Sequence, residues 1–412
     1  MAAATIGCGN SARSTFTSDA PAHSSPTADG PAAGNIDFRP GTSFATGPNP
    51  SGVALADLDG DGRLDIVVGD RASDLVSVLL NTTEPNATMP SFATHADFVT
   101  GDTGSGAIGS PAVAVTDLDG DGRPDVVAGN NRGTISVLMN ATVAGSSALS
   151  FAAHADFASI ENAFSIAVDD FNGDGKPDLA LVAGGPTGTA ATVSVFLDTT
   201  ASSTPTFAPR LDIATGNDAN HVIAADVNGD ALPDLVVSNG VASTLSILTT
   251  TTAPDASAAT FAKTDLATAN GPLALTSADF NGDGKPDLVA AETFADGAAV
   301  EVFLDKSTSE AATPTFTSTG TQAAEILVPQ AIAASDLDGD GKPDLVIVGG
   351  DQISVWLDTT APNASATTFA GHVDLPASGP IAIAIGDLNG DGKPDLVMTS
   401  STSNTVSVLL GE

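Results

Sequence analysis

The residues with the clearest chemistry form an acidic loop of nine residues that occurs seven times. The first copy is Asp57-Leu-Asp-Gly-Asp-Gly-Arg-Leu-Asp65, and the later copies begin at Asp117, Asp170, Asp226, Asp279, Asp336 and Asp387. Positions 1, 5 and 9 are Asp in every copy, and position 3 is Asp or Asn. Hard oxygen ligands without His or Cys suit Ca²⁺, whereas Mg²⁺ requires a stricter octahedron that retains waters. The loops therefore predict up to seven calcium sites, one in each copy.

Alternate residues of a tight loop can face one centre, so we expect side-chain ligands at positions 1, 3, 5 and 9 and a backbone carbonyl ligand at position 7. The expected ligands are Asp57, Asp59, Asp61, Arg63 and Asp65 in loop one; Asp117, Asp119, Asp121, Arg123 and Asp125 in loop two; Asp170, Asn172, Asp174, Lys176 and Asp178 in loop three; Asp226, Asn228, Asp230, Leu232 and Asp234 in loop four; Asp279, Asn281, Asp283, Lys285 and Asp287 in loop five; Asp336, Asp338, Asp340, Lys342 and Asp344 in loop six; and Asp387, Asn389, Asp391, Lys393 and Asp395 in loop seven.

Loop four departs from the other copies. It has Ala231 at position 6, where every other copy has Gly, so its turn must either avoid a positive φ or be strained. The weakest calcium site is therefore expected between Asp226 and Asp234.

The seven loops also differ from an EF-hand. Position 12, counted from the first Asp, holds Val68, Ala128 and their equivalents rather than Glu, and the flanking residues have a strand pattern.

These loops need strands to position them, and each repeat contains a pattern for four. An Ala-rich alternating stretch such as Val53–Ala56 precedes each loop, and a continuous apolar run such as Ile66–Val68 follows it. A third stretch alternates, as in Val76–Val78, and a fourth begins near a Phe such as Phe92. Short strands at a regular spacing, separated by Gly, Pro, Asn and Thr, predict an all-β array.

The two ends of the array indicate how it closes. The last repeat ends after its third strand, whereas Phe38–Phe44 followed by Ala-Thr-Gly matches Phe207–Ile213 followed by Ala-Thr-Gly. Both segments reach the first Asp of a loop after 13 residues. We therefore expect residues 36–412 to form a seven-bladed β-propeller of four-stranded blades, closed by an N-terminal strand that completes the last blade and leaves no unpaired edge. An open solenoid, the alternative, would need atypical capping repeats.

Residues 1–35 are rich in Ser, Ala, Pro and Gly, which predicts a disordered tether. The start of the chain has no basic n-region and no full apolar region, so the sequence as given contains no complete signal peptide. Ile6-Gly7-Cys8 resembles the end of a bacterial lipoprotein signal, which would place a lipid anchor at Cys8. An unstructured end with an incidental cysteine is the alternative.

Composition excludes several classes of function. The chain has 50 acidic and 13 basic residues among 412, a formal net charge of -37, which argues against binding nucleic acid or anionic lipid. No apolar run is long enough for a membrane span. The single cysteine excludes an internal disulfide. Tyr is absent and Trp356 is the single Trp, which disfavours carbohydrate stacking and therefore a lectin.

The acidic loops, the DLVV-type strands after them and the VSVLL-type third strands resemble the FG-GAP or VCBS repeats of integrin α-chain heads and of many bacterial surface and secreted proteins. The resemblance covers about residues 36–412. It implies a seven-bladed propeller whose calcium lies in hairpin loops on one face, between the first two strands of each blade. It does not specify the function, because these repeats serve adhesion, lectins and appendages of enzymes.

The histidines do not suggest a catalytic or zinc site. His95, His154 and His372 each lie three residues after the Phe of a fourth strand, in separate repeats, so a structural role is expected because zinc ligands must converge. His221 precedes a first strand, and we expect it in a turn rather than as a general base. Asn-x-Ser/Thr sequons begin at Asn81, Asn86, Asn140 and Asn363, in loops expected at the surface.

The residues that escape the repeat are the candidates for recognition. Connections between second and third strands, at Asp70–Asp74, Asn130–Gly133 and Glu292–Gly297, are expected on the face opposite the calcium loops, together with the long connection Thr100–Pro111. Within these segments Arg71, Arg132 and Phe294 are the best anchors for a protein or glycan partner.

The sequence contains no non-repeating cluster of acid, base and electrophile. The expected function is that of a non-enzymatic, calcium-binding module for binding, adhesion or scaffolding. The expected location is extracellular or at the cell surface. If Cys8 carries a lipid anchor, the chain would be lipoprotein-tethered or periplasmic. The alternatives are a propeller-type carbohydrate-active enzyme, a lyase or hydrolase, and a lectin.

Overall fold

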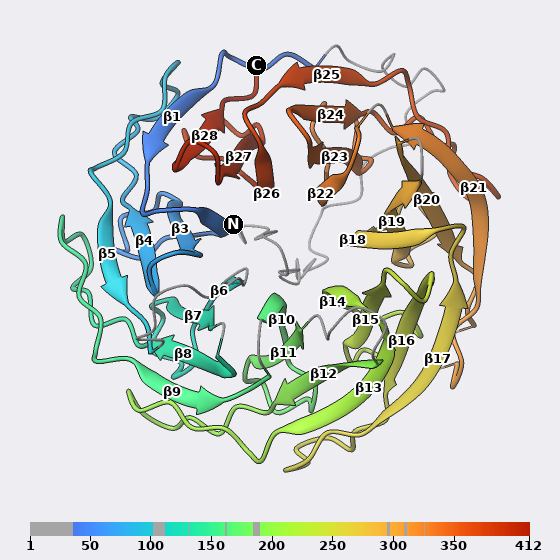
Figure 1. The fold of residues 1–412 in the computed structure, drawn as a ribbon, viewed down its shortest axis with the longest axis horizontal. Helices are drawn as coiled ribbons and strands as arrows, with labels where there is room; N and C mark the ends of the chain where they lie inside the picture. The colour runs from blue at the N-terminus through green and yellow to red at the C-terminus, as the bar shows by residue number, and fades with distance from the viewer. Residues whose placement is uncertain are drawn as a thin grey trace, which may run out of the picture.

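The computed structural model describes residues 36–101, 112–130, 132–160, 163–183, 190–294, 297–308, 311–324 and 326–412. These residues form seven four-stranded sheets arranged in a ring around a central axis (Figure 1). The predicted fold, an all-β propeller with seven four-stranded blades, is therefore confirmed. Within these residues no helix is long and apolar enough to cross a membrane. The predicted tether, with Cys8, lies outside the described residues.

Each blade has an inner, a second, a third and an outer strand, and neighbours in the sheet are antiparallel. The inner strands are β2 (Pro50–Ala56), β6 (Val113–Thr116), β10 (Ala163–Asp169), β14 (Ala219–Ala225), β18 (Gly271–Ala278), β22 (Pro329–Ser335) and β26 (Pro380–Gly386). The second strands are β3 (Asp65–Asp70), β7 (Asp125–Gly129), β11 (Asp178–Ala183), β15 (Asp234–Asn239), β19 (Asp287–Phe294), β23 (Asp344–Gly349) and β27 (Asp395–Ser400).

The third strands are β4 (Leu75–Leu79), β8 (Thr134–Leu138), β12 (Ala190–Phe196), β16 (Thr244–Thr250), β20 (Gly297–Asp305), β24 (Gln352–Trp356) and β28 (Thr405–Leu409). The outer strands are β5 (Ala96–Val99), β9 (Ala155–Ala158), β13 (Leu211–Asn217), β17 (Phe261–Ala267), β21 (Phe316–Ala324), β25 (Val373–Pro376) and β1 (Thr42–Ala45). Blade one contains β2–β5, and the blades follow in chain order to blade seven, which contains β26–β28 and β1.

Burial along the strands explains their composition. The second strands β3, β7, β11, β15, β23 and β27 are buried over their whole length, which accounts for their continuous apolar runs. Outer strands such as β9 and β13 alternate between half-buried and exposed residues, because one of their faces meets solvent. The acidic loops connect inner to second strands, so all seven lie at the same end of the ring.

The core consists of clusters that lie between neighbouring blades. Leu55 and Ile66 of blade one, for example, share a cluster with Ala384 and Val397 of blade seven. Edge-to-face phenylalanine pairs add to the same boundary, where the ring centroids of Phe44 and Phe92 are 4.9 Å apart. Each blade is therefore stabilised by both of its neighbours rather than by its own hydrogen bonds alone.

The strand β1 lies beside β28, at the outer edge of blade seven (Figure 1). Thr42 is opposite Val408 and Ala45 is opposite Thr405 in this antiparallel pair. Upstream of β1, the backbone N–H of Arg39 donates to the carbonyl of Leu410 at 2.9 Å. The two ends of the described chain therefore contribute strands to the same sheet.

Candidate metal centres

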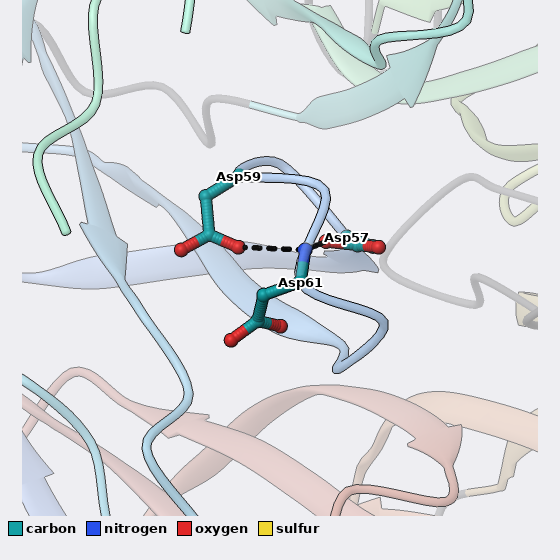
Figure 2. A group of neighbouring side chains, drawn as sticks. All are labelled: Asp57, Asp59 and Asp61. Carbon is teal, nitrogen blue, oxygen red and sulfur yellow. Dashed lines mark hydrogen bonds between the residues drawn. The ribbon is translucent and has the colours of Figure 1, made fainter. Parts of the chain in front are cut away.

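A common hydrogen-bond frame shapes the acidic loops. In loop one the two carboxylate oxygens of Asp57 accept the backbone N–H groups of Asp61 at 3.0 Å and Gly62 at 2.9 Å. The N–H of Asp61 also reaches Oδ1 of Asp59, so Asp57, Asp59 and Asp61 surround one turn (Figure 2). In all seven loops, position 1 accepts from the N–H of position 6 and position 5 accepts from the N–H of position 7.

Position 6 of each loop has a left-handed backbone. Gly62 has a φ of 90°, and Ala231 in loop four has a φ of 71°. Of the two outcomes predicted for loop four, the structure therefore has the strained one, because an L-residue with a Cβ rarely adopts this region. The expectation that loop four binds calcium most weakly stays a prediction.

The aspartate at position 9 anchors each loop to the rest of its blade. In loop one Asp65 is almost fully buried, and it accepts the N–H of Leu58 at 2.9 Å and the N–H of Asn81, just beyond β4, at 2.8 Å. The same pair of bonds occurs in all seven blades. Position 9 therefore has a structural role that the sequence pattern did not reveal.

The carboxylates converge closely enough to hold one cation. Oxygen atoms of positions 1, 3 and 5 (Asp57, Asp59 and Asp61) lie within 4.8 Å of one another in loop one. In loops two and six the oxygens that lie within this distance belong to positions 1, 3 and 9. Ca²⁺–oxygen distances are about 2.3–2.6 Å, so two ligands of one ion lie at most about 5 Å apart. Loops one, two and six are the three loops with Asp at position 3. The donor set and its spacing therefore fit a hard divalent cation.

Electrostatics also favours a cation at these loops. Burial, and to a smaller extent the neighbouring loop carboxylates, raise the pKa of Asp65 to about 8, although two backbone N–H groups oppose the shift. The pKa of Asp178 rises to about 8 for the same reasons. A bound divalent cation would neutralise the clustered charge and so remove the repulsion between the loop carboxylates.

In loops one to six, position 7 varies together with the residue near the end of the third strand whose backbone N–H bonds to position 9. In loop one, Nη2 of Arg63 contacts Oδ2 of Asp61 at 2.7 Å, and the residue that bonds to position 9 is Asn81. In loop three, Nζ of Lys176 donates to the carbonyl of Thr200 at 2.6 Å, close to the buried Asp198. Burial raises the pKa of Asp198 and the lysine opposes that shift. Loops five and six repeat the combination of Lys with Asp, whereas loop seven has Lys393 with Gly411. Comparing these two positions along the chain could have identified the pair.

The loops also connect neighbouring blades. The carbonyl of position 3 accepts a backbone N–H from the connection between the third and outer strands of the next blade, as in the 2.6 Å bond from Gly145 to Asp59. Three further bonds of this kind join Asn86 to Asn389, Asp255 to Asn172 and Asn363 to Asn281. The four donor residues have φ values of 73°, 58°, 56° and 57° respectively. The acidic loops are therefore part of the boundary between blades as well as candidate cation sites.

The histidines do not form a common site. His95, His154 and His372 lie in three different blades, and each contacts the Asp two residues later, at 2.8, 3.0 and 3.1 Å. The expectation of a turn at His221 is wrong, because this residue lies within β14 and is buried. Burial lowers the pKa of His221 to about 4, so its side chain is neutral at physiological pH.

Several residues that the sequence places in exposed connections, on the face opposite the acidic loops, are buried. Glu292 was expected in a connection, but β19 extends to Phe294 and Glu292 is fully buried. Asp70 is buried as the last residue of β3, and Asn130, just beyond β7, is buried while its amide donates to Ser136 at 2.8 Å. Arg71 is half-buried and Arg132 is exposed. The predicted anchor side chain of Phe294 and most of Thr100–Pro111 lie outside the described residues.

The four sequons fall into two groups. Asn86 and Asn363 are exposed, as expected. Asn81 and Asn140 are 2% and 4% exposed, so the expectation of surface exposure is wrong for them. Nδ2 of Asn140 donates to the carbonyl of Leu58 in the preceding blade at 2.9 Å, and Asn81 makes the equivalent bond to Leu388 at 2.8 Å. These two amides hold neighbouring blades together.

Comparison with known proteins agrees with this architecture. The FG-GAP-like repeat model matches residues 24–68, 117–181, 170–237 and 336–398, and the FG-GAP repeat model matches residues 271–304. The comparison with curated proteins found no relative.

Several solved structures are similar in fold. The crystal structure of BBS1N in complex with ARL6DN, soaked with lead, has a TM-score of 0.57 at 10% identity, and the mercury soak has 0.54 at 11%. Each alignment covers 91% of this chain and 96% of that chain. A lectin from Agrocybe aegerita, described as recognising non-reducing terminal N-acetylglucosamine, has a TM-score of 0.47 at 17% identity over 79% of both chains. Because the FG-GAP-like model matches more than half of its length, the chain belongs to the family of FG-GAP-like repeat proteins.

Proposed function

We propose that this propeller is a calcium-stabilised, non-enzymatic binding module that acts outside the cell or at its surface. Convergence of carboxylates is the observation that carries the proposal. Three loops bring side-chain oxygens of three acidic residues within 4.8 Å of one another, and in all seven loops position 1 accepts the N–H of position 6. In that frame, positions 1, 3, 5 and 9 would hold the ion. Bound calcium would neutralise the negative charge that is clustered at these positions.

Calcium binding is tested by calorimetry of the full chain in calcium, in magnesium and in chelator. A ligand that binds only the folded state at 100 times its dissociation constant stabilises by about 2.7 kcal/mol per site. We expect a higher melting temperature in calcium than in chelator, with a smaller effect of magnesium, because magnesium requires a stricter octahedron. An unchanged melting temperature in calcium would refute the proposal.

Recognition is proposed for the face opposite the acidic loops. Val241 is 50% exposed in the connection between β15 and β16, and Leu327 is 77% exposed just before β22. Both lie at the end of the ring that carries the connections between second and third strands. Exposed apolar side chains on an acidic molecule favour a protein partner over a polymeric anion. The similar BBS1N propeller was solved in complex with ARL6DN, so the fold is compatible with protein binding.

Partner class is tested with the purified chain on a glycan array and with a panel of polysaccharides. We expect no polymer to be degraded, since the recurrent acidic side chains belong to the loop frames. Release of fragments from any polysaccharide would replace this proposal with the enzyme alternative. Saturable binding of a single glycan would replace it with the lectin alternative. Detection of the chain in the surface or secreted fraction of its native cell tests the proposed location.

A further inference from the structure

A cavity of about 540 Å³ lies at the end of the ring opposite the acidic loops. Its lining comes from six of the seven blades, with Phe164 from blade three, Leu273 from blade five and Ile381 from blade seven among the contributors. The inner strands that carry these residues surround the axis of the ring (Figure 1). The volume is within the range of small-molecule sites, which is about 300–1,000 Å³. We call this the axial cavity.

Five of the lining residues occupy the same position of the repeat, six residues before the first Asp of a loop. They are Phe164, Asn220, Leu273, Gln330 and Ile381. In each case the pairing of inner and second strands shifts register at this residue, as between Ala163 and Ser165 in blade three. A β-bulge leaves its extra residue unpaired and redirects its side chain, and bulges are common beside active sites. The inner strands of blades three to seven therefore each present one redirected side chain to the axial cavity.

These five residues do not follow the repeat. Two positions later every blade has an aliphatic residue, such as Ile166 or Val222, whereas the bulge position alternates along blades three to seven between apolar side chains and amides. Packing of the ring needs the aliphatic residue, but it does not require an amide at the bulge position. Nδ2 of Asn220 donates to the carbonyl of Asp218 at 3.0 Å, and its Oδ1 remains available as an acceptor. Gln330 is exposed and Asn220 is half-buried. Variation at one position of an otherwise regular repeat is expected where a unique ligand is recognised.

The charge of the lining limits the ligand. No described residue that lines the axial cavity is acidic, although the chain has 50 acidic residues, so the cavity does not suit a cation. The net charge of -37 opposes an anion. His221, at the same cavity, is neutral because burial lowers its pKa to about 4. Arg71 is the cationic residue of the described lining, and its guanidinium is a hydrogen-bond donor.

We infer that the axial cavity binds an uncharged organic molecule. Its apolar body would pack against Phe164, Leu273 and Ile381, and its carbonyl or hydroxyl groups would hydrogen-bond to Asn220, Gln330 or Arg71. Apolar walls with a few polar groups are the usual composition of such sites. This site is independent of the calcium loops, which lie at the other end of the ring, so it can be tested separately from the proposed function.

The test is a fluorescence titration of the full chain with 6-propionyl-2-(dimethylamino)naphthalene, an uncharged aromatic ketone whose emission shifts to the blue in an apolar site. We expect one saturable site. Leu273→Asp places a carboxylate in the cavity and should weaken binding at least about tenfold. The matched control is Ala242→Asp, which changes an exposed residue outside the described lining at the same end of the ring and should leave the affinity within about twofold.

Two further measurements complete the test. Gln330→Leu changes an exposed side chain, so the variant should fold as the unmodified chain does. Loss of the proposed hydrogen bond should weaken binding of the ketone by about fivefold. The anion 1-anilinonaphthalene-8-sulfonate, of similar size, should bind at least about tenfold more weakly than the ketone. The inference is overturned if the ketone shows no saturable binding, if both cavity variants bind it as the unmodified chain does, or if the anion binds equally well.

Discussion

The backbone N–H of Asn86 in blade one donates a 2.7 Å hydrogen bond to the carbonyl of Asn389 in the acidic loop of blade seven. This bond crosses the boundary between the first and last repeats of the chain. It requires a φ of 58° at Asn86, and the corresponding donors in three other blades have φ values between 56° and 73°. The left-handed backbone at this residue is therefore part of the contact between blades.

Replacing Asn86 tests this relationship. Asn86→Ala should lower the free energy of unfolding by about 1 kcal/mol, because Ala tolerates a positive φ less well than Asn does. Asn86→Gly should stay within about 0.5 kcal/mol of the unmodified chain, since Gly adopts this region without a steric penalty. Urea unfolding measures both, and equal stabilities for the two variants would contradict the prediction.

The acidic loop has two roles: it anchors the blade through position 9, and it is the proposed calcium site. Substitutions at positions 9 and 5 separate these roles. Asp65→Asn removes an acceptor from one of two buried backbone N–H groups and should cost about 2–3 kcal/mol of unfolding free energy even in chelator. Asp61→Asn keeps an acceptor for the N–H of Arg63 and loses only an exposed ion pair, so it should cost less than about 1 kcal/mol there.

In calcium, both variants should lose stabilisation relative to the unmodified chain, because each removes a carboxylate from the proposed site. Urea unfolding in chelator and in calcium measures the two effects. The anchoring role of Asp65 fails if Asp65→Asn is no less stable than Asp61→Asn in chelator.

Loop four should gain stability from a single glycine. Ala231→Gly relieves a φ of 71° and should raise the free energy of unfolding by about 1 kcal/mol, together with the calcium affinity of this loop. The matched control is Gly175→Ala at the same position of loop three, where an added Cβ would meet no atom within 4 Å and only the φ of 86° opposes it. This variant should lose about the same amount. No gain in Ala231→Gly would show that loop four is not strained.

The buried carboxylates of Glu292 and Glu301 in blade five should make the free energy of unfolding depend on pH. Burial, then a hydrogen bond and charge contact with Glu301, raise the pKa of Glu292 to about 8 from an ordinary value of 4.5. The backbone N–H groups of Asn270 and Ala269 oppose this shift only partly, because neither oxygen of Glu292 accepts a hydrogen bond of normal geometry and the N–H of Ala269 donates to Glu301. Protonated Glu292 can donate to Glu301. The folded chain therefore keeps a proton between pH 4.5 and 8 that the unfolded chain has released.

The stabilisation that comes from the retained proton on Glu292 is complete below pH 4.5. As the pH rises from 4.5 towards 8, the free energy of unfolding should fall by about 1.4 kcal/mol per pH unit. Glu292→Gln cannot ionise, so its stability relative to the unmodified chain should increase over this range. Glu84→Gln, at an exposed position, is the control and should not change the pH profile. Urea unfolding at pH 5 and pH 8 measures the difference, and parallel profiles for Glu292→Gln and the unmodified chain would refute the shared proton.

Much of this architecture could be predicted because its determinants are local. An acidic loop such as Asp57–Asp65 specifies its turn through residues within nine positions, and strand alternation such as Val76–Val78 specifies which face is buried. Seven copies then indicate blades, because no single four-stranded unit can bury its apolar face alone. The expected ligands, the fold class and the order of strands in a blade follow from these short-range patterns.

The remaining features depend on packing between blades, which no single repeat encodes. Asn81 and Asn140 are buried because their amides reach the preceding blade, and Glu292 is buried because β19 continues beyond the predicted strand end. Phe164 faces the axis because of a bulge whose position depends on how β10 pairs with β11. The sequence by itself determined the repeat, its strands and its acidic loops. Only the tertiary structure decided which polar residues are buried and which side chains meet at the axis, because those contacts join residues from blades far apart in the chain.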